Sequence, residues 1–175
     1  RRALVYAAER FAAAFSHAEL VQNPEDVPVL RRLRVPADRV TLLGNGVDLG
    51  RFGRHGDVEA VRREVRSGWG VADGEIVVGT VGRLVLEKGY REVFDAWEAV
   101  RRSHPGARLV VIGPAEPDKA DGLPDPEIER ARSMGVHFEG HRDDVERCYH
   151  GMDVFVLASH REGFPRAAME AAASG

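Results

Sequence analysis

From about Val78 onward, short runs rich in valine and isoleucine alternate with segments of helical periodicity. Buried strands separated by helices favour a parallel sheet that is covered by helices on both faces. The sequence therefore predicts an α/β fold with a Rossmann-like parallel sheet. The expected strands are 75–81, 108–112, 136–138 and 153–158, and the expected helices are 88–102, 126–134, 143–150 and one from about residue 164.

The first 75 residues have a different pattern, with expected helices at 5–15, 23–34 and 58–66 and short strands at 18–22 and 40–43. A glycine-rich polar stretch separates the two patterns, and Asn45-Gly46 within it predicts a left-handed turn that serves as a hinge or an interdomain turn. We expect residues 1–43 to close one domain, 44–57 to form an interdomain linker, and 58–175 to form a second domain. Because the chain opens and ends within helical patterns, we interpret it as a fragment, incomplete at the C-terminus of the second domain, with apolar surface exposed on residues 1–43.

The composition is that of a globular protein, with 43% apolar and 30% charged residues. A net charge of −3 gives no general reason to expect a nucleic-acid partner. The single cysteine, Cys148, excludes an intrachain disulfide, fits a reducing compartment and is expected to be buried. There is no Asp-x-Asp triplet, and the 7 histidines lack ligand spacing, so we expect neither a metal nor a cofactor.

Two carboxylates, Glu162 and Glu170, stand eight positions apart around the expected start of the last helix. If the helix ran from Glu162, they would be about 12 Å apart along its axis, more than the roughly 5–9.5 Å of a glycosidase pair. Pro165 suits the first helical turn, and the amides of residues 163, 164 and 166 would then be free to bind a diphosphate. The spacing fits two acids that hold the two ends of a nucleotide sugar.

Two cations follow the first expected strand of the second domain. Arg83 comes directly after that strand, and Lys88 opens the next helix. A positive charge at a helix N-terminus is unfavourable for the helix dipole, so a purely structural role explains Lys88 poorly. The pair could neutralise a diphosphate and stabilise the charge that develops on a leaving nucleoside diphosphate.

Four motifs in this order resemble those of retaining glycosyltransferases of family 4, which have the GT-B fold. They are Gly44-Asn45-Gly46-Val47-Asp48 with Phe52, Gly82-Arg83 with Lys88-Gly89, Phe138-Glu139-Gly140, and Glu162-Gly163-Phe164 followed by Glu170. The resemblance implies two Rossmann-like domains that face each other across a cleft. Residues 1–43 would then end the acceptor domain, and residues 58–175 would form most of the donor domain.

The resemblance also implies roles for individual residues. Glu162 would contact the donor sugar, with Arg83 and Lys88 as its catalytic partners at the diphosphate, and Glu170 would bind the ribose hydroxyls. Further donor contacts are expected from Gly163, Phe164, Pro165, Gly82, Gly113, His141 and Arg142. For Phe164 a core position is an equal alternative, and Arg166 either reaches a phosphate or faces solvent. His160 is more simply a packed or solvated residue.

A glycosyltransferase of this kind would move a sugar from a nucleoside-diphosphate sugar, with a UDP-sugar favoured, to an acceptor hydroxyl with retention. The acceptor would be a glycan or lipid-linked, and the process would be cell-envelope polysaccharide or glycan synthesis. We expect the full protein to be cytoplasmic, with peripheral association at the inner face of the membrane, and residues 1–175 to be inactive alone. Two alternatives stay open: a non-catalytic nucleotide-sugar-binding module, and another GT-B enzyme such as an epimerase or phosphorylase.

Overall fold

The computed structural model describes residues 2–175, and the chain divides into two compact units after Gly46. Each unit has its own parallel sheet, so each is described by itself. Within the described residues, no helix is both long enough and apolar enough to cross a membrane.

The first unit is small and has little core of its own. It contains α1 (Arg2–Phe15), β1 (Glu19–Val21), α2 (Asp26–Arg32), a 3-10 turn at Ala37–Arg39 and β2 (Val40–Leu42). The two strands pair in parallel, with Glu19 opposite Val40. Three large apolar side chains of α1 are mostly exposed: Leu4 at 80%, Phe11 at 69% and Phe15 at 73%.

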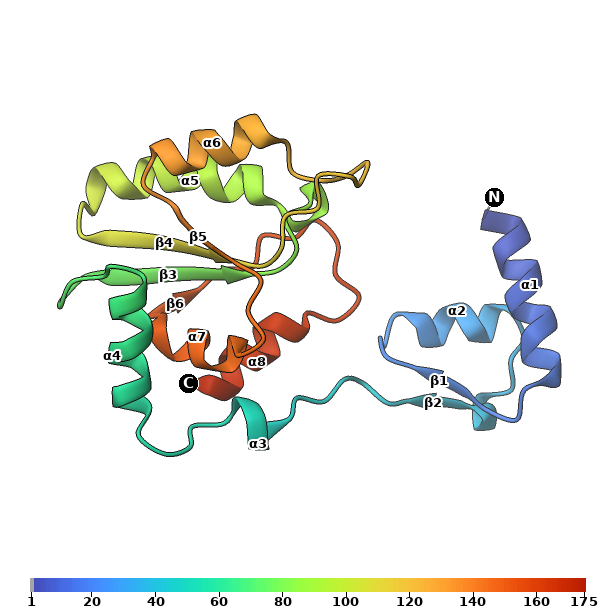
Figure 1. Ribbon diagram of the computed structural model, residues 1–175. Coiled ribbons are helices and arrows are strands. Elements are labelled where there is room, and N and C mark those ends of the chain that lie inside the picture. Colours follow the sequence, from blue (N-terminus) through green and yellow to red (C-terminus); the bar gives the residue numbers. More distant parts are fainter. Residues whose placement is uncertain (1) are drawn as a thin grey trace. The chain divides into compact units, whose positions relative to one another are not determined.

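The second unit is a four-stranded parallel sheet with helices on both faces (Figure 1). Its strands are β3 (Ile76–Val81), β4 (Ala107–Ile112), β5 (His137–Gly140) and β6 (Val154–Phe155), in the spatial order β5-β4-β3-β6. Its helices are α3 (Leu49–Phe52), α4 (Val58–Gly68), α5 (Tyr90–Ser103), α6 (Asp125–Ser133), α7 (Val145–Gly151) and α8 (Arg166–Ser174). The predicted α/β class with a parallel sheet is therefore confirmed.

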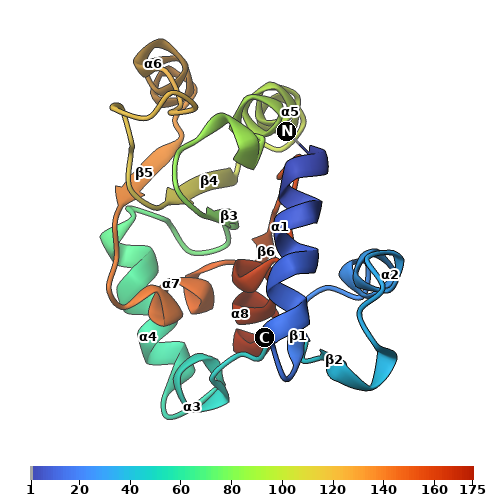
Figure 2. The same ribbon diagram turned by 90° about the vertical axis from the view of Figure 1, so that its right-hand side faces the viewer.

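Alternation along β4 divides the core between the two faces of this sheet. Leu109 and Val111 pack with the aromatic residues of α5 and with α6, whereas Val110 and Ile112 pack with α3, α4 and α7. Seen from the side, α5 and α6 lie across the strands from α4, α7 and α8 (Figure 2). All four of these β4 side chains are at most 1% exposed, as expected for a strand covered on both faces.

The strand order places a topological switch point between β3 and β6. The chain runs from β3 outward through β4 to β5 and then returns to the other side of β3 to form β6. In open parallel sheets, ligands bind outside the carboxyl ends of the strands at such a point. The carboxyl ends here lead into Gly82 and Arg83 after β3, and into the loop that carries Glu162 after β6.

Part of the stretch expected as a linker, 44–57, is regular structure that belongs to the second unit. The Asp48 side chain caps α3 by accepting hydrogen bonds from the amides of Gly50 at 2.9 Å and Arg51 at 3.2 Å. Phe52 is 6% exposed and packs in the core beside α7 and α8. Asp57 caps α4 through the amide of Ala60 at 2.9 Å.

The carboxylate of Asp153 ties α4 to the sheet near the start of β6. Asp153 Oδ2 accepts hydrogen bonds from the amide of Val77 at 2.7 Å and from Arg66 Nη1 at 3.0 Å, and Oδ1 accepts one from Arg62. Both arginines also donate to carbonyl oxygens at the end of α7. Asp153 therefore connects α4, α7, β3 and β6.

Several predicted elements are present with changed bounds. The strand expected at 153–158 is only Val154–Phe155, because the chain then leaves the sheet for an irregular loop. The helix expected from Lys88 begins at Tyr90, after a 3-10 turn at Leu86–Lys88 and a left-handed Gly89. The last helix begins at Arg166, so Pro165 is its N-cap residue and Glu162 lies in the loop before it.

Candidate functional site

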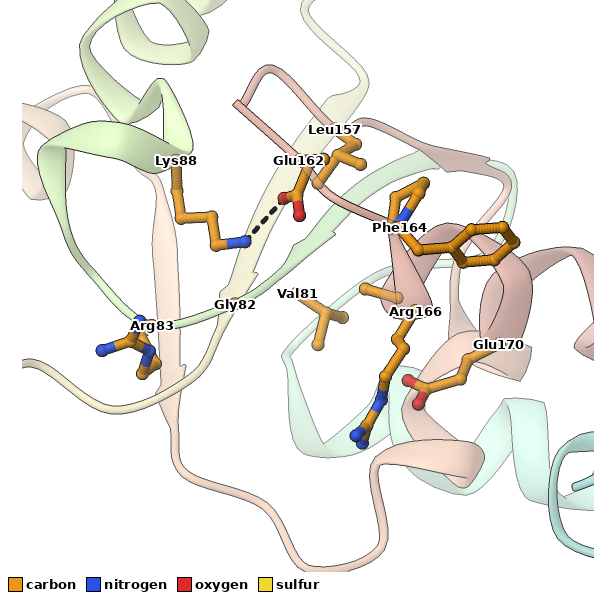
Figure 3. Close-up of a pocket in the computed structure, with 11 residues that line it drawn as sticks. Val81, Gly82, Arg83, Lys88, Leu157, Glu162, Phe164, Arg166 and Glu170 are labelled. Carbon is orange, nitrogen blue, oxygen red and sulfur yellow. Dashed lines mark hydrogen bonds and ion pairs between the residues drawn. The ribbon is translucent and has the colours of Figure 1, made fainter. Parts of the chain in front are cut away.

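A pocket of about 450 Å³ opens at the switch point between β3 and β6 (Figure 3). It brings together residues from the end of β3, the 3-10 turn, the loop after β6 and the first turns of α8. The lining residues are Val81, Gly82, Arg83, Lys88, Leu157, Glu162, Phe164, Pro165, Arg166, Ala167 and Glu170. Seven of the residues predicted from the sequence are among them: Gly82, Arg83, Lys88, Glu162, Phe164, Pro165 and Glu170.

One ion pair joins two of the residues that line the pocket. Lys88 Nζ donates to Glu162 Oε1 at 2.6 Å, and both side chains are about three-quarters buried. Partial burial acts to raise the pKa of Glu162, but the hydrogen bond from Lys88, a contribution from Ser159 and the positive charge of Lys88 together hold that pKa below its ordinary value. Glu162 is thus a carboxylate whose orientation is set by a cation.

Gly89 permits the close approach that forms this pair. It has φ +71°, and a Cβ placed there would overlap the carbonyl oxygen of Ala158. The amide of His160 also donates to the carbonyl oxygen of Glu87 at 3.0 Å. The loop after β6 is therefore held directly against the turn that carries Lys88, and only glycine fits at the contact.

Arg83 is held at the other side of the pocket by an acid that the sequence argument did not identify. Arg83 Nη1 donates to Glu116 Oε2 at 3.0 Å, while the Arg83 side chain stays 50% exposed. Lys119 also pairs with Glu116, and its hydrogen bond is the main reason that the pKa of Glu116 lies below its ordinary value, with Arg83 adding to the effect. Nothing in the proline-rich loop around Glu116 signals this contact in advance.

Glu170 and Arg166 stand one helical turn apart on α8, and both line the pocket. Glu170 Oε2 accepts a hydrogen bond from the hydroxyl group of Tyr149 at 2.9 Å. Figure 3 shows Arg166 and Glu170 on the same side of the pocket, across from Lys88 and Arg83. Arg166 lines the pocket and is also exposed to solvent, so both alternatives for it stay open.

The amides at the start of α8 differ from the prediction in one respect. The amide of Arg166 donates to the carbonyl oxygen of Phe164 at 3.0 Å, so it is not available to an anion. In the described part of this loop and helix start, the amides of Gly163, Phe164 and Ala167 have no hydrogen-bond acceptor. The helix start therefore offers Ala167 where the sequence suggested Arg166, because the helix begins later than expected.

Four other predicted residues do not line the pocket as the structure describes it. Gly163 lies in the loop beside it, and Gly113, at φ +143°, packs so closely on Gly82 that a Cβ would overlap the Gly82 carbonyl oxygen. His141 is paired with Asp143 at 3.1 Å on an exposed loop. Arg142 forms a two-pronged contact with Asp144, at 2.7 and 2.8 Å, and also pairs with Glu139.

Two further expectations concern residues outside the site. Cys148 is fully buried as predicted, and burial raises the pKa of its thiol to about 11, which makes it a poor nucleophile. His160 does not line the pocket, and its Nε2 lies 2.9 Å from Glu92 Oε1 on α5. Within the part of the chain that is described, no group of three or more His, Cys, Asp or Glu side chains could hold a metal ion.

The pocket combines cations and carboxylates in a way that suits a particular ligand. Arg83, Lys88 and Arg166 supply positive charge, and the Phe164 and Ala167 amides add donors for an anionic centre. Glu162 and Glu170 supply acceptors for hydroxyl groups on either side. A phosphate-containing ligand with hydroxyl-rich groups at both ends matches this arrangement.

Sequence relatives point to one family. The model of the protein family described as "Glycosyl transferases group 1" matches residues 61–175, which is more than half of the chain. The chain is 34% identical over 138 residues to a glycogen synthase of Mycobacterium tuberculosis (strain CDC 1551 / Oshkosh), covering 78% of this chain and 30% of the relative. It is 25% identical over 162 residues to the N,N'-diacetylbacillosaminyl-diphospho-undecaprenol alpha-1,3-N-acetylgalactosaminyltransferase of Campylobacter jejuni, covering 92% of this chain and 41% of the relative.

A solved structure shows the same fold over most of the chain. Anabaena HepE, crystallised in complex with UDP and glucose, superposes with a TM-score of 0.75 at 21% identity, covering 93% of this chain and 44% of HepE. The chain thus spans less than half the length of each of these relatives. From the family match and the identity to the mycobacterial relative, the chain belongs to the glycosyl transferases group 1 family, with the GT-B type of α/β fold.

Proposed function

We propose that this chain supplies the donor-binding part of a glycosyltransferase that uses a nucleoside-diphosphate sugar. The observation that carries the proposal is the convergence of Arg83, Lys88, Glu162 and Glu170 in one pocket at the β3–β6 switch point. Cations at such a point suit a diphosphate, and flanking carboxylates suit hydroxyl groups. Residues 1–46 would belong to the acceptor domain, and the rest to the donor domain.

In the proposed reaction, the bond between the anomeric carbon and the diphosphate oxygen breaks, and its electron pair leaves with the nucleoside diphosphate. Arg83 and Lys88 stabilise the charge that develops on that oxygen. The acceptor hydroxyl attacks the same face of the sugar, and its proton passes to the departing diphosphate. Because attack and departure take place on the same face, the configuration at the anomeric carbon is retained, while Glu162 orients the sugar and Glu170 holds the ribose.

Lys88 must serve both Glu162 and the diphosphate in this scheme. A lysine ammonium has three donors on a flexible stem, so it can keep its contact with Glu162 while donating to a phosphate oxygen. The pair then links the two ends of the scissile bond: the sugar on the glutamate and the leaving group on the lysine. A shift of the loop that carries Glu162 would therefore move the sugar relative to the leaving group and slow the reaction.

A UDP-sugar is the favoured donor, and no cofactor is required in this proposal. HepE is described in complex with UDP and glucose, which agrees with that choice. The name of the Campylobacter relative includes a diphospho-undecaprenol group, which supports a lipid-linked acceptor. A cytoplasmic reaction with peripheral association at the membrane is part of the same proposal. Cell-envelope polysaccharide or glycan synthesis is the proposed setting.

Calorimetric titration of residues 1–175 with UDP-, GDP- and ADP-glucose tests donor binding. We expect saturable binding of at least one of them, with UDP-glucose the tightest. A Lys88→Met variant should bind about tenfold or more weakly, since it loses a charge-assisted hydrogen bond. Arg102→Met, which removes an exposed cation on α5, is the matched control and should bind normally. A folded protein that binds none of the three would refute the donor site.

The alternatives make different predictions for the full-length protein. A non-catalytic binding module would show no turnover, and a Glu162→Gln variant would change nothing but affinity. A phosphorylase would consume inorganic phosphate, and an epimerase would need no acceptor. Sugar transfer that depends on the acceptor and is lost in Glu162→Gln supports the proposed function over all three.

A further inference from the structure

Tyr149 does not line the pocket itself, but its buried side chain contacts Glu170, which does. The residue is 5% exposed and lies on α7, whereas Glu170 lies on the facing helix α8. The Tyr149 hydroxyl donates to Glu170 Oε2 at 2.9 Å. No other hydrogen bond or ion pair engages the Glu170 carboxylate among the described residues, so Oε1 remains for a ligand.

Aromatic packing fixes the Tyr149 ring in place. Phe52 on α3 lies 6.1 Å away at 63°, and Phe155 on β6 lies 5.9 Å away at 65°, both as edge contacts. Such pairs hold a ring from two sides. Ser174, one turn after Glu170, donates to the Phe52 carbonyl oxygen at 2.9 Å and so ties the end of α8 to the same cluster. The hydroxyl position is therefore set by three elements of the core.

The chemistry of the contact favours an oriented carboxylate. Burial, reinforced by the hydrogen bond to Glu170, raises the pKa of Tyr149, so its hydroxyl remains a proton donor at neutral pH. A free glutamate on a helix samples several rotamers, and fixing one of them before binding removes that entropic loss from the binding step. A glutamate held by one oxygen presents the other in a single direction.

We propose that Tyr149 is a positioning residue, which holds Glu170 so that its Oε1 accepts hydrogen bonds from the ribose hydroxyls of the donor. This inference rests on the proposed function and assigns a role to a residue that does not itself touch the ligand. It predicts that Tyr149 governs the preference for a ribose with hydroxyls over one without them. A residue with a purely structural role would weaken both ligands alike.

The test compares UDP with 2′,3′-dideoxyuridine diphosphate by calorimetry on residues 1–175. We expect the unmodified chain to bind UDP about tenfold or more tightly than the dideoxy compound, because the dideoxy compound lacks the hydroxyls that donate hydrogen bonds to a charged acceptor. Tyr149→Phe keeps the ring but removes the donor. It should reduce the ratio to about threefold or less, while affinity for the dideoxy compound changes less than about twofold.

Two further variants separate positioning from loss of stability. Tyr90→Phe removes another buried hydroxyl, which donates to the Gly82 carbonyl oxygen at 2.8 Å, and should leave the UDP to dideoxy ratio unchanged. In a Glu170→Gln background, adding Tyr149→Phe should not change the ratio further. An unchanged ratio in Tyr149→Phe, or equal weakening of both ligands, would overturn this inference alone. If the unmodified chain does not bind UDP, the proposed function falls, and this inference falls with it.

Discussion

Lys88 Nζ lies 2.6 Å from Glu162 Oε1, which joins the turn after β3 to the loop after β6. The two residues are 74 positions apart in the chain, so the contact depends on the parallel pairing of β3 with β6. A cation and an acid that the sequence suggested as separate contacts are thus one unit at the switch point of the sheet.

Replacing Gly89 should disturb the Lys88–Glu162 pair. An alanine there is strained by the positive φ and also overlaps the Ala158 carbonyl oxygen. We expect Gly89→Ala to lower the free energy of unfolding by more than about 2 kcal/mol and to weaken UDP-glucose binding, as measured by urea unfolding and calorimetry.

Gly70→Ala is the matched control for Gly89→Ala. Gly70 has a similar φ of +66°, but a Cβ there has no neighbour within 4 Å. It should cost only the backbone strain, about 1 kcal/mol, and leave ligand binding intact. Equal effects of the two substitutions on stability and binding would show that the Ala158 contact has no importance.

Asp153 should make stability depend on pH in the acid range. Partial burial acts to raise the pKa of Asp153, but hydrogen bonds from the Val77 amide, Arg66 and Arg62 outweigh it and keep the pKa below the ordinary 3.8. A carboxyl group with a depressed folded pKa stabilises the fold above its unfolded pKa and loses this contribution as pH falls through the folded value. Asp153→Asn should therefore destabilise the protein by about 2 kcal/mol at pH 7.

The difference between the unmodified protein and Asp153→Asn should close as pH falls below about 4, which urea unfolding at pH 7, 5 and 3 can measure. Asp95→Asn is the control, because Asp95 is 67% exposed in its pair with Arg130 and should contribute less than about 0.5 kcal/mol. A difference that stays constant from pH 7 to pH 3 would contradict the role given to the Asp153 carboxylate.

The apolar face of α1 should drive self-association of residues 1–175. Leu4, Phe11 and Phe15 are each at least 69% exposed, and large exposed apolar patches favour association. Sedimentation velocity should show oligomers that grow with concentration, and Phe11→Glu with Phe15→Glu should reduce them. Removal of residues 1–46 should do the same. A monodisperse monomer over a wide concentration range would be inconsistent with this expectation.

The sheet could be predicted because its signals are local, since apolar runs such as Leu109–Ile112 indicate buried strands. The grouping of Arg83 with Glu162 came from the resemblance of their motifs to a known family. Element boundaries were less accurate. The last helix was expected to begin earlier than it does, so a free amide was predicted at Arg166, whereas the free amide is that of Ala167.

Contacts made by loops could not be predicted. Glu116 reaches Arg83 across 33 positions, and Tyr149 reaches Glu170 from a helix on which the tyrosine looks like any core residue. His141 and Arg142 stay predicted donor contacts from the family resemblance, and the local pairing of their side chains with Asp143, Glu139 and Asp144 could not be predicted. The spacing of residues in the sequence does not indicate which acidic side chain a surface arginine will pair with.

The structure of the protein in complex with a UDP-sugar tests the central claim most directly. The account predicts a diphosphate within hydrogen-bonding distance of Arg83 and Lys88, the sugar beside Glu162, and the ribose hydroxyls on Glu170 in the pocket between β3 and β6. A donor bound at another site, or bound in this pocket with its diphosphate away from both Arg83 and Lys88, would contradict it.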